Sequence, residues 1–513
     1  MMCSVCLAEE PTTRSADPTA RTTTRPATTQ VGKEDKSGDH LFITHHTLTL
    51  GDGRKLDYTA TAGTMQQRDE SGKALADMFF VAYTLDHPGA TTQSTAATRP
   101  VTFVFNGGPG AASVWLHLGT AGPKRIKLDE NGIPSAPPFE LVDNESTWLD
   151  ATDLVFIDPV GTGYSRPAEG VKGEQFYGVQ QDIQSVGNFI RLWTTRNERW
   201  PSPKFLAGES YGTTRAAGLS EHLLEKQGIS LNGIVLISSV LNFQTIVNAP
   251  GNELPYPLFL PTYTAAAAYH KKLEPELTRD LDATLREVEQ WALGDYAVAL
   301  MKGDSLRDDA KQQIAQRLSR YTSLPVDWIL KADLRIDPSR FRQELLADQR
   351  KVIGRFDART TGYVADPLNV DPEYDPSLSL VLPIYSANLN HYVRDELKYE
   401  SDLPYEVLSE KVHPWKFSKG AGDSFGYLYV ADTMRDTILK NPQLKVLFAQ
   451  GRLDLATPFA SSDYTIDHLG LPPELAKNIS RTYYPAGHMM YHDPGSRKKL
   501  HDDVAALIAA GTK

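Results

Sequence analysis

The sequence contains very little cysteine. Its 513 residues include two, Cys3 and Cys6, both within the first six positions. A chain whose body contains no cysteine cannot form disulfide bonds or thiolate metal sites there. The two cysteines form a C-x-x-C pair, but no strand pattern precedes them and no helical pattern follows, which argues against a redox motif. We therefore expect the fold to rest on an ordinary hydrophobic core.

Long apolar runs and a positive charge excess are also missing. No stretch reaches the roughly 18 consecutive apolar residues that a membrane-spanning helix needs. The formal net charge is −11. An acidic chain does not hold nucleic acid or anionic membranes by charge, so we expect neither partner. A hydrophobic fraction of 41% is typical of a soluble globular protein, and nothing in the motifs calls for a cofactor or metal.

The first 40 residues contain few large apolar side chains. They begin with a short apolar stretch that has no basic residues before it, and continue through a segment rich in Thr, Pro and Arg. Such a composition cannot bury enough apolar surface to fold. We interpret residues 1–40 as a disordered leader or linker. The apolar start is compatible both with the end of an export signal and with an ordinary terminus.

What the sequence does contain is an alternation of strand and helix patterns. Strand-like runs such as PVTFVFNGG, TDLVFIDPVG and LNGIVLISS are separated by amphipathic segments of helical spacing. This order predicts an α/β fold with a mostly parallel central sheet and helices on both faces. We assign residues 41–250 and 426–513 to two parts of one α/β core, and residues 251–425 to a helical insertion, or lid, between them.

A G-x-S-x-G pentapeptide, GESYG, places Ser210 between a predicted strand and a predicted helix. This is the context of a nucleophile on a sharp strand-to-helix turn, where flanking glycines avoid collisions. The alternative interpretation is a packed serine in a glycine-rich turn. Two other serines compete less well, because Ser165 has Pro167 in place of the second glycine and Ser113 has no glycine pair.

A serine nucleophile needs a base, and the base needs an orienting acid. Past Ser210, Asp454 and His488 each follow a predicted strand, in the chain order expected for this architecture. His492 lies four residues after His488, but a zinc motif would need glutamate where Met489 stands. The remaining histidines considered lack a strand before them and are interpreted as structural or exposed: His391, His413 and His468.

An oxyanion hole needs backbone N–H groups directed at the reacting carbonyl oxygen. The segment NGGPG directly follows a predicted strand, and Tyr211 directly follows the serine. In this architecture one donor comes from such a loop and the other from the residue after the nucleophile. The alternative for NGGPG is a plain tight turn.

Taken together, NGGPGAAS, DPVGTGYS, GESYG, GRLDLATP and AGHMM resemble, in the same order, the motifs of the serine carboxypeptidase family, a branch of the α/β hydrolases. The resemblance implies an exopeptidase that acts on peptides with a free C-terminal carboxylate, without a cofactor. It implies export to the periplasm or outside the cell, and it is compatible with a homodimer. It implies these roles: a triad of Ser210, Asp454 and His488, oxyanion donors at Gly108 and Tyr211, and carboxylate recognition by Asn106 and Glu209.

The sequence departs from this family at three positions. Ala111 replaces a cysteine, so the usual disulfide is absent, Thr213 stands where a small residue is usual, and Thr120 replaces a second glutamate. Because two carboxyls would otherwise share a proton, we expect a weaker preference for acidic pH or an altered recognition of the carboxylate. Two alternatives stay open: acyl transfer or ester hydrolysis with the same triad, and a non-catalytic binding protein on the same fold.

Overall fold

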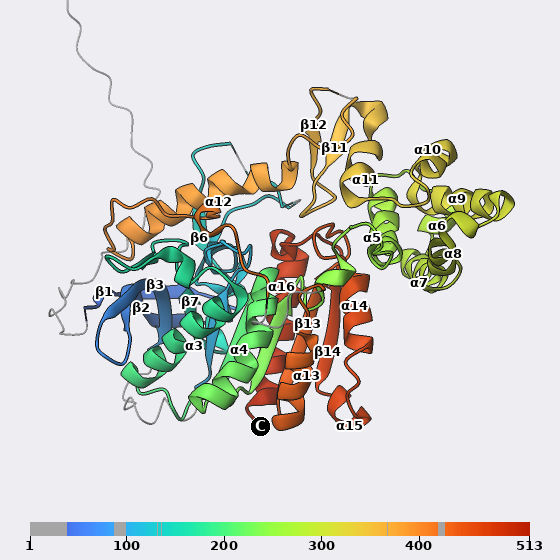
Figure 1. Cartoon of the computed structure of the whole chain (residues 1–513). Coiled ribbons are helices and arrows are strands. Elements are labelled where there is room, and N and C mark those ends of the chain that lie inside the picture. Colours follow the sequence, from blue (N-terminus) through green and yellow to red (C-terminus); the bar gives the residue numbers. More distant parts are fainter. Residues whose placement is uncertain (1–37, 87–98, 131, 135, 367, 419–425) are drawn as a thin grey trace, which may run out of the picture.

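The computed structural model describes residues 38–86, 99–130, 132–134, 136–366, 368–418 and 426–513. Cys3, Cys6 and nearly all of the predicted leader lie outside these residues. A single large sheet runs through the molecule in the order β1-β2-β3-β7-β4-β9-β10-β13-β14, with β8 paired to β3 (Figure 1). The strands from β7 to β14 are mutually parallel, which confirms the prediction of a mostly parallel α/β sheet.

One edge of the sheet is antiparallel. The long strands β1 (His40–Thr49), β2 (Lys55–Arg68) and β3 (Ala74–Leu85) form a meander, and β3 pairs antiparallel with β7 (Asp153–Ile157) and with the short β8 (Arg166–Pro167). β1 alternates between more and less buried side chains, as expected of a strand at a sheet edge with one face on the core.

The parallel strands place all predicted site segments at one end of the sheet. These strands are β4 (Val101–Phe105), β9 (Lys204–Glu209), β10 (Gly233–Ile237), β13 (Lys445–Gly451) and β14 (Ile479–Tyr484). In β4 and β10 every residue is buried, which explains their largely apolar sequences. Because parallel strands share a direction, the loops after β4, β9, β13 and β14 meet at their carboxyl ends.

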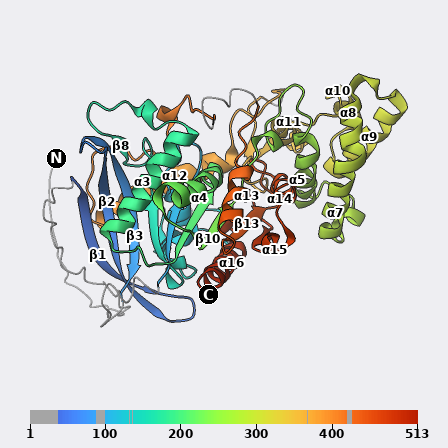
Figure 2. The same ribbon diagram turned by 60° about the horizontal axis from the view of Figure 1, so that its bottom comes forward.

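Alternate strand residues face two separate cores. In β10, Val235 and Ile237 belong to one cluster, and Ile234 and Leu236 to the other. The second cluster contains α3 (Val179–Arg196), α4 (Tyr211–Gln227) and α13 (Ala431–Lys440). The first contains α2 (Val114–Leu116), η1 (His117–Ala121), η9 (Met490–His492), α12 (Pro376–Asp395) and α16 (Pro494–Gly511). Helices therefore cover both faces of the sheet, and Figure 2 shows α3, α4 and α13 over one of them.

Between β10 and β13 the chain leaves the sheet and returns. It first builds a helical lobe with its own core, seen beside the sheet in Figure 1. The lobe contains α5 (Pro255–Tyr269), α6 (Pro275–Thr278), α7 (Leu281–Trp291), η5 (Ala292–Tyr296), α8 (Ala297–Lys302), η6 (Gly303–Ser305), α9 (Asp308–Thr322), α10 (Val326–Lys331) and α11 (Pro338–Glu344). A small hairpin of β11 (Lys351–Ile353) and β12 (Thr361–Tyr363) follows η7 (Ala347–Gln349).

α12 lies in the range predicted to be a lid, but it is not part of the helical lobe. It packs on the sheet core, and its Tyr392 hydroxyl bonds the Tyr83 hydroxyl of β3 at 3.0 Å. The remaining short elements connect the core: β5 (Lys124–Ile126), β6 (Leu141–Asp143), η2 (Trp148–Asp150), η3 (Gly173–Gln175), η4 (Phe243–Thr245), η8 (Glu410–Val412), α14 (Phe459–Asp467) and α15 (Pro473–Ala476). Across the described segments, no helix is both long and apolar enough to cross a membrane.

Candidate active site

Ser210 lies on a sharp turn between β9 and α4. Its backbone has φ 60° and ψ −129°, a positive-φ conformation that residues with side chains rarely adopt and that concentrates at functional sites. The chain must also pass itself closely, because a Cβ on Gly208 would lie 2.3 Å from the Gly212 oxygen. The Ser210 amide donates to the Ile237 carbonyl at 3.0 Å, which ties the turn to β10. This local geometry agrees with a nucleophile turn.

Asp454 and His488 come together from the ends of β13 and β14. The His488 Nδ1 donates to Asp454 Oδ2 at 2.7 Å, and both side chains are buried. Asp454 is held in turn by the amides of Ala456 and Thr457 at 2.8 and 3.1 Å and by the Thr457 hydroxyl at 2.7 Å. Burial opposes protonation of His488, but the charge and hydrogen bond of Asp454 outweigh it, so the pKa of His488 is raised. An imidazole with this partner can accept and return a proton.

Ser210 and His488 line one pocket of about 180 Å³, together with Asn106, Glu209 and Tyr211. Much of the remaining lining is apolar and comes from both core and insertion: Trp115, Val240, Phe243, Ile246, Phe356, Leu378, Leu408 and Met489. Within the described chain no hydrogen bond joins the Ser210 hydroxyl to His488. Catalytic hydrogen bonds are often long before substrate binds, so the absence of this bond does not argue against a pairing of the two residues in their shared pocket.

The backbone amides predicted to face an oxyanion lie beside this serine. Tyr211 is the first residue of α4, so its N–H has no acceptor within the helix. Gly108 lines the same pocket with φ +97°, a conformation that favours glycine. Next to it, a Cβ on Gly107 would lie 2.4 Å from the Tyr211 nitrogen, so only glycine lets the two segments approach. Gly108 and Tyr211 therefore both line the pocket that contains Ser210.

Asn106 and Glu209 form a buried pair in the pocket. The Asn106 Nδ2 donates to Glu209 Oε1 at 3.0 Å, and its Oδ1 accepts from the Leu116 amide at 3.0 Å. Burial raises the pKa of Glu209 to about 7, against the lowering effects of His488 and of two hydrogen bonds. Glu209 can therefore carry a proton near neutral pH, which would let it donate a hydrogen bond to a bound carboxylate.

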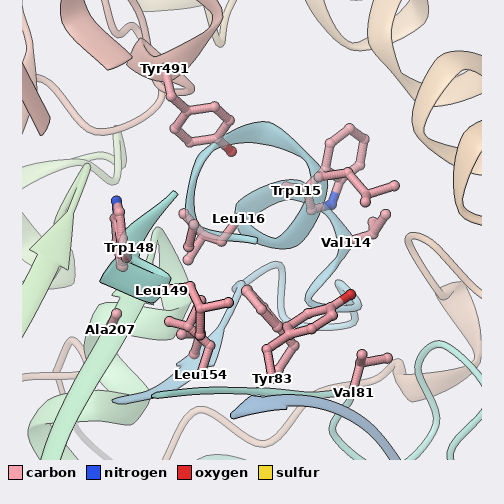
Figure 3. Close-up of a cluster of buried hydrophobic side chains, with 14 of the residues drawn as sticks. Val81, Tyr83, Val114, Trp115, Leu116, Trp148, Leu149, Leu154, Ala207 and Tyr491 are labelled. Atoms are coloured by element: carbon pink, nitrogen blue, oxygen red, sulfur yellow. The ribbon is translucent and has the colours of Figure 1, made fainter. Parts of the chain in front are cut away.

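The second partner of Glu209 is Tyr491, which sequence reasoning missed. Its hydroxyl donates to Glu209 Oε2 at 2.8 Å. Figure 3 shows its ring against the helical turn that carries Trp115 and Leu116. A Cβ on Gly119 would lie 2.4 Å from this ring, so the phenol fills the space beside η1. The tyrosine in AGHMMYH, three residues past His488, was the available signal.

Thr120 does not take part in this pair. It is fully buried on η1, its hydroxyl has no hydrogen-bond partner among the described residues, and it does not line the pocket. Its carbonyl accepts from Asn144 Nδ2 at 2.6 Å. Where the resemblance leads us to expect a second carboxyl at Glu209, the structure has the Tyr491 hydroxyl.

Residues 407–409, near the end of the insertion, pair through backbone hydrogen bonds with the glycine-rich loop at residues 110–112. The Ala112 amide donates to the Val407 carbonyl at 3.0 Å, and the Ser409 amide donates to the Gly110 carbonyl at 2.8 Å. A Cβ on Gly110 would lie 2.5 Å from the Ser409 oxygen, so this contact also requires glycine. Ala111 forms an isolated bridge with Leu408, a pocket residue. Backbone pairing therefore holds the loop in a chain without the disulfide expected there.

The competing serines and the second histidine have structural partners. Ser165 donates to the Asp158 carbonyl at 2.6 Å, and Ser113 donates to the Ile157 carbonyl. His492 bonds the Tyr385 hydroxyl at 2.8 Å, and burial lowers its pKa to about 3. Over the described ranges, no three His, Cys, Asp or Glu side chains gather as metal ligands.

Comparison with known proteins extends these observations. The serine carboxypeptidase family model matches residues 54–489. Serine carboxypeptidase-like 36 of Arabidopsis thaliana is 29% identical over 153 residues, which cover 28% of this chain and 29% of that protein. Pheromone-processing carboxypeptidase KEX1 of Meyerozyma guilliermondii is 30% identical over 136 residues, or 25% and 18% of the two chains. The chain therefore spans less than a third of the length of these two relatives.

A solved structure shares the fold across nearly the whole chain. The prohormone-processing carboxypeptidase Kex1(Δ)p of Saccharomyces cerevisiae superimposes with a TM-score of 0.53 at 15% identity, covering 92% of each chain. At this identity the likeness establishes the α/β-hydrolase fold alone. The match of the family model over most of the sequence establishes more: the chain belongs to the serine carboxypeptidase family.

Proposed function

We propose that this protein is a serine carboxypeptidase that releases C-terminal amino acids through an acyl-enzyme intermediate. The observation that carries the proposal is one pocket that combines Ser210 and His488 with the buried Asn106–Glu209 pair. A triad alone would suit many esterases. A neutral glutamic acid beside an amide group adds a site that recognises a free carboxylate.

In the proposed mechanism, Ser210 attacks the carbonyl of the last peptide bond while His488 takes its proton. The Gly108 and Tyr211 amides stabilise the oxyanion, and Asp454 holds the imidazole and its positive charge. His488 then protonates the leaving amino group, and water hydrolyses the acyl-enzyme by the same route. Asn106 and protonated Glu209 hold the terminal carboxylate and so place the scissile bond over Ser210. Export of the protein is part of this proposal. The N-terminal stretch, which is compatible both with an export signal and with an ordinary terminus, lies outside the described residues.

Carboxylate recognition predicts a strong preference for a free acid over its amide. We expect an N-blocked dipeptide to be cleaved with a kcat/KM at least about 100-fold above that of its C-terminal amide. Glu209→Ala should narrow this acid-to-amide ratio by about 10- to 100-fold, because one charge-assisted hydrogen bond is lost. The measurement is kcat/KM for both substrates with both proteins. Equal cleavage of acid and amide by the wild type would leave an esterase or acyltransferase as the better description.

The hydrogen bond from Tyr491 to Glu209 predicts how the affinity for a free-acid inhibitor depends on pH. A free-acid inhibitor should lose affinity above about pH 7, where Glu209 loses its proton. Since the Tyr491 hydroxyl lowers the pKa of Glu209, Tyr491→Phe should move this loss to higher pH, by about half to one unit. The measurement is the ratio of inhibition constants for the acid and its amide between pH 5 and 9.

Tyr385→Phe is the matched control for this measurement. It removes a phenol that is equally buried but binds His492, so the midpoint should stay in place. A midpoint that moves equally in both variants, or in neither, would contradict the assigned role of Tyr491.

The proposed role of protonated Glu209 predicts peptidase activity up to near-neutral pH. A rate maximum clearly below pH 5 would contradict this role.

A further inference from the structure

The pocket contains one permanent positive charge. Among its described lining residues, Arg355 is the only lysine or arginine, and it lies with Glu209 and His488 in an otherwise largely apolar site. Arg355 comes from the insertion, two residues after the end of β11, whereas Asn106 directly follows β4 and Glu209 ends β9. Arg355 and the proposed carboxylate pair therefore belong to different segments of the chain.

The backbone of Arg355 is held from two sides. Its amide donates to Asp375 Oδ1 at 3.0 Å, and its carbonyl accepts from the Leu455 amide at 3.0 Å. Leu455 directly follows Asp454, so the hydrogen bond attaches the insertion to the loop of the orienting acid. Arg355 is thus tied to the catalytic loop as well as to the N-terminus of α12.

The guanidinium has no carboxylate partner within the described chain. It lies over the Phe356 ring at 5.2 Å, and this ring is 5.0 Å from the His488 imidazole. Asp375, which binds the Arg355 backbone amide, also accepts from the Ser377 amide and lies 3.7 Å from the Arg342 guanidinium. The positive charge of Arg355 lowers the pKa of His488, but the larger effect of Asp454 raises it overall. An exposed, unpaired arginine in a mainly apolar pocket can attract an anionic group of a ligand.

We propose that Arg355 makes this pocket select peptides with an acidic side chain in one of the two residues joined by the scissile bond. The inference rests on the proposed function. The terminal carboxylate binds at Asn106 and Glu209, and the aspartate or glutamate side chain of the substrate pairs with the guanidinium. Because Arg355 is exposed, water and salt screen this pair, so we expect a modest preference for the acidic peptide.

The test compares two pairs of N-blocked dipeptides: Phe-Glu against Phe-Gln, and Glu-Phe against Gln-Phe. In one pair the wild type should favour the acidic peptide by about 5- to 10-fold in kcat/KM, and added salt should reduce the ratio. Arg355→Gln should bring this ratio close to one, and Arg355→Lys should keep part of it. Arg340→Gln, an exposed arginine of the insertion outside the pocket, is the control and should keep the wild-type ratio.

Three results would overturn the inference. They are ratios near one for both pairs in the wild type, an unchanged ratio in Arg355→Gln, and an equal loss for all free acids, which would place the terminal carboxylate on Arg355. The same peptides are also measured as ligands of Ser210→Ala, with and without Arg355→Gln, by calorimetry. If Ser210→Ala binds the acidic peptides selectively but the wild type cleaves none of the peptides, the proposed function is contradicted and the inference is supported. If the wild type cleaves the peptides without selectivity, the proposed function is supported and the inference is contradicted.

Discussion

Ser210→Ala is expected to lower kcat/KM for an N-blocked dipeptide by about 10⁵-fold or more. Alanine keeps the size of the turn and removes the only atom that can form the acyl-enzyme. The Gly108 and Tyr211 amides and the carboxylate pair stay in place, so the variant should still bind peptides. A small residual rate over the uncatalysed reaction would come from these groups.

Ser113→Ala is the matched control, because it removes a serine that competes on sequence grounds. Its hydroxyl donates to the Ile157 carbonyl, so the substitution should affect stability more than chemistry. A serine-reactive phosphonate should label the wild type and Ser113→Ala and should leave Ser210→Ala unlabelled. Labelling or turnover that persists in Ser210→Ala would refute the assignment, and an unlabelled wild type would support a non-catalytic binding protein.

The second large effect concerns a buried ion pair beneath the site. Arg215 Nε of α4 donates to Asp182 of α3 at 2.8 Å, and Arg215 Nη1 donates to the Asn106 carbonyl at 2.6 Å. Both side chains are almost fully buried. Arg215→Ala should lower the free energy of unfolding by about 3–5 kcal/mol, because it leaves Asp182 charged and unpaired in the core. It should also lower activity, since the Asn106 backbone loses its support.

The loss should grow with pH. Burial raises the pKa of Asp182 above its usual 3.8, and Arg215 opposes that rise. Without Arg215 the folded protein holds the Asp182 proton more tightly than the unfolded chain does. Stability of the variant should therefore fall, relative to wild type, as pH rises from about 4 toward 7. Urea unfolding at several pH values measures this difference.

A double variant, Asp182→Leu with Arg215→Met, provides the control for this prediction. It removes both charges while keeping apolar volume, so much of the stability should return. A pH-independent loss in Arg215→Ala, or no recovery in the double variant, would show that packing and not charge explains the effect.

The local parts of the site were readable from the sequence. GESYG specified the turn at Ser210 because both glycines act within four residues of each other, where the backbone passes itself too closely for a Cβ. Asp454 and His488 could be chosen because each follows an apolar strand. Parallel strands bring their carboxyl ends together whatever the rest of the chain does. The α/β fold followed from the alternation of such strands with amphipathic helical segments.

Contacts between distant segments were decided by the tertiary structure. Tyr491 meets Glu209 across 282 residues of sequence, and no spacing rule relates the two positions. The backbone pairing of Val407 and Ser409 with the glycine-rich loop leaves no side-chain pattern to read. The packing of α12 on the sheet core, and not in the helical lobe, depends on which apolar surfaces bury each other. The sequence by itself therefore determined which candidate side chains the strand ends carry. The folded chain alone decided which groups surround that chemistry, because hydrophobic burial is not directional.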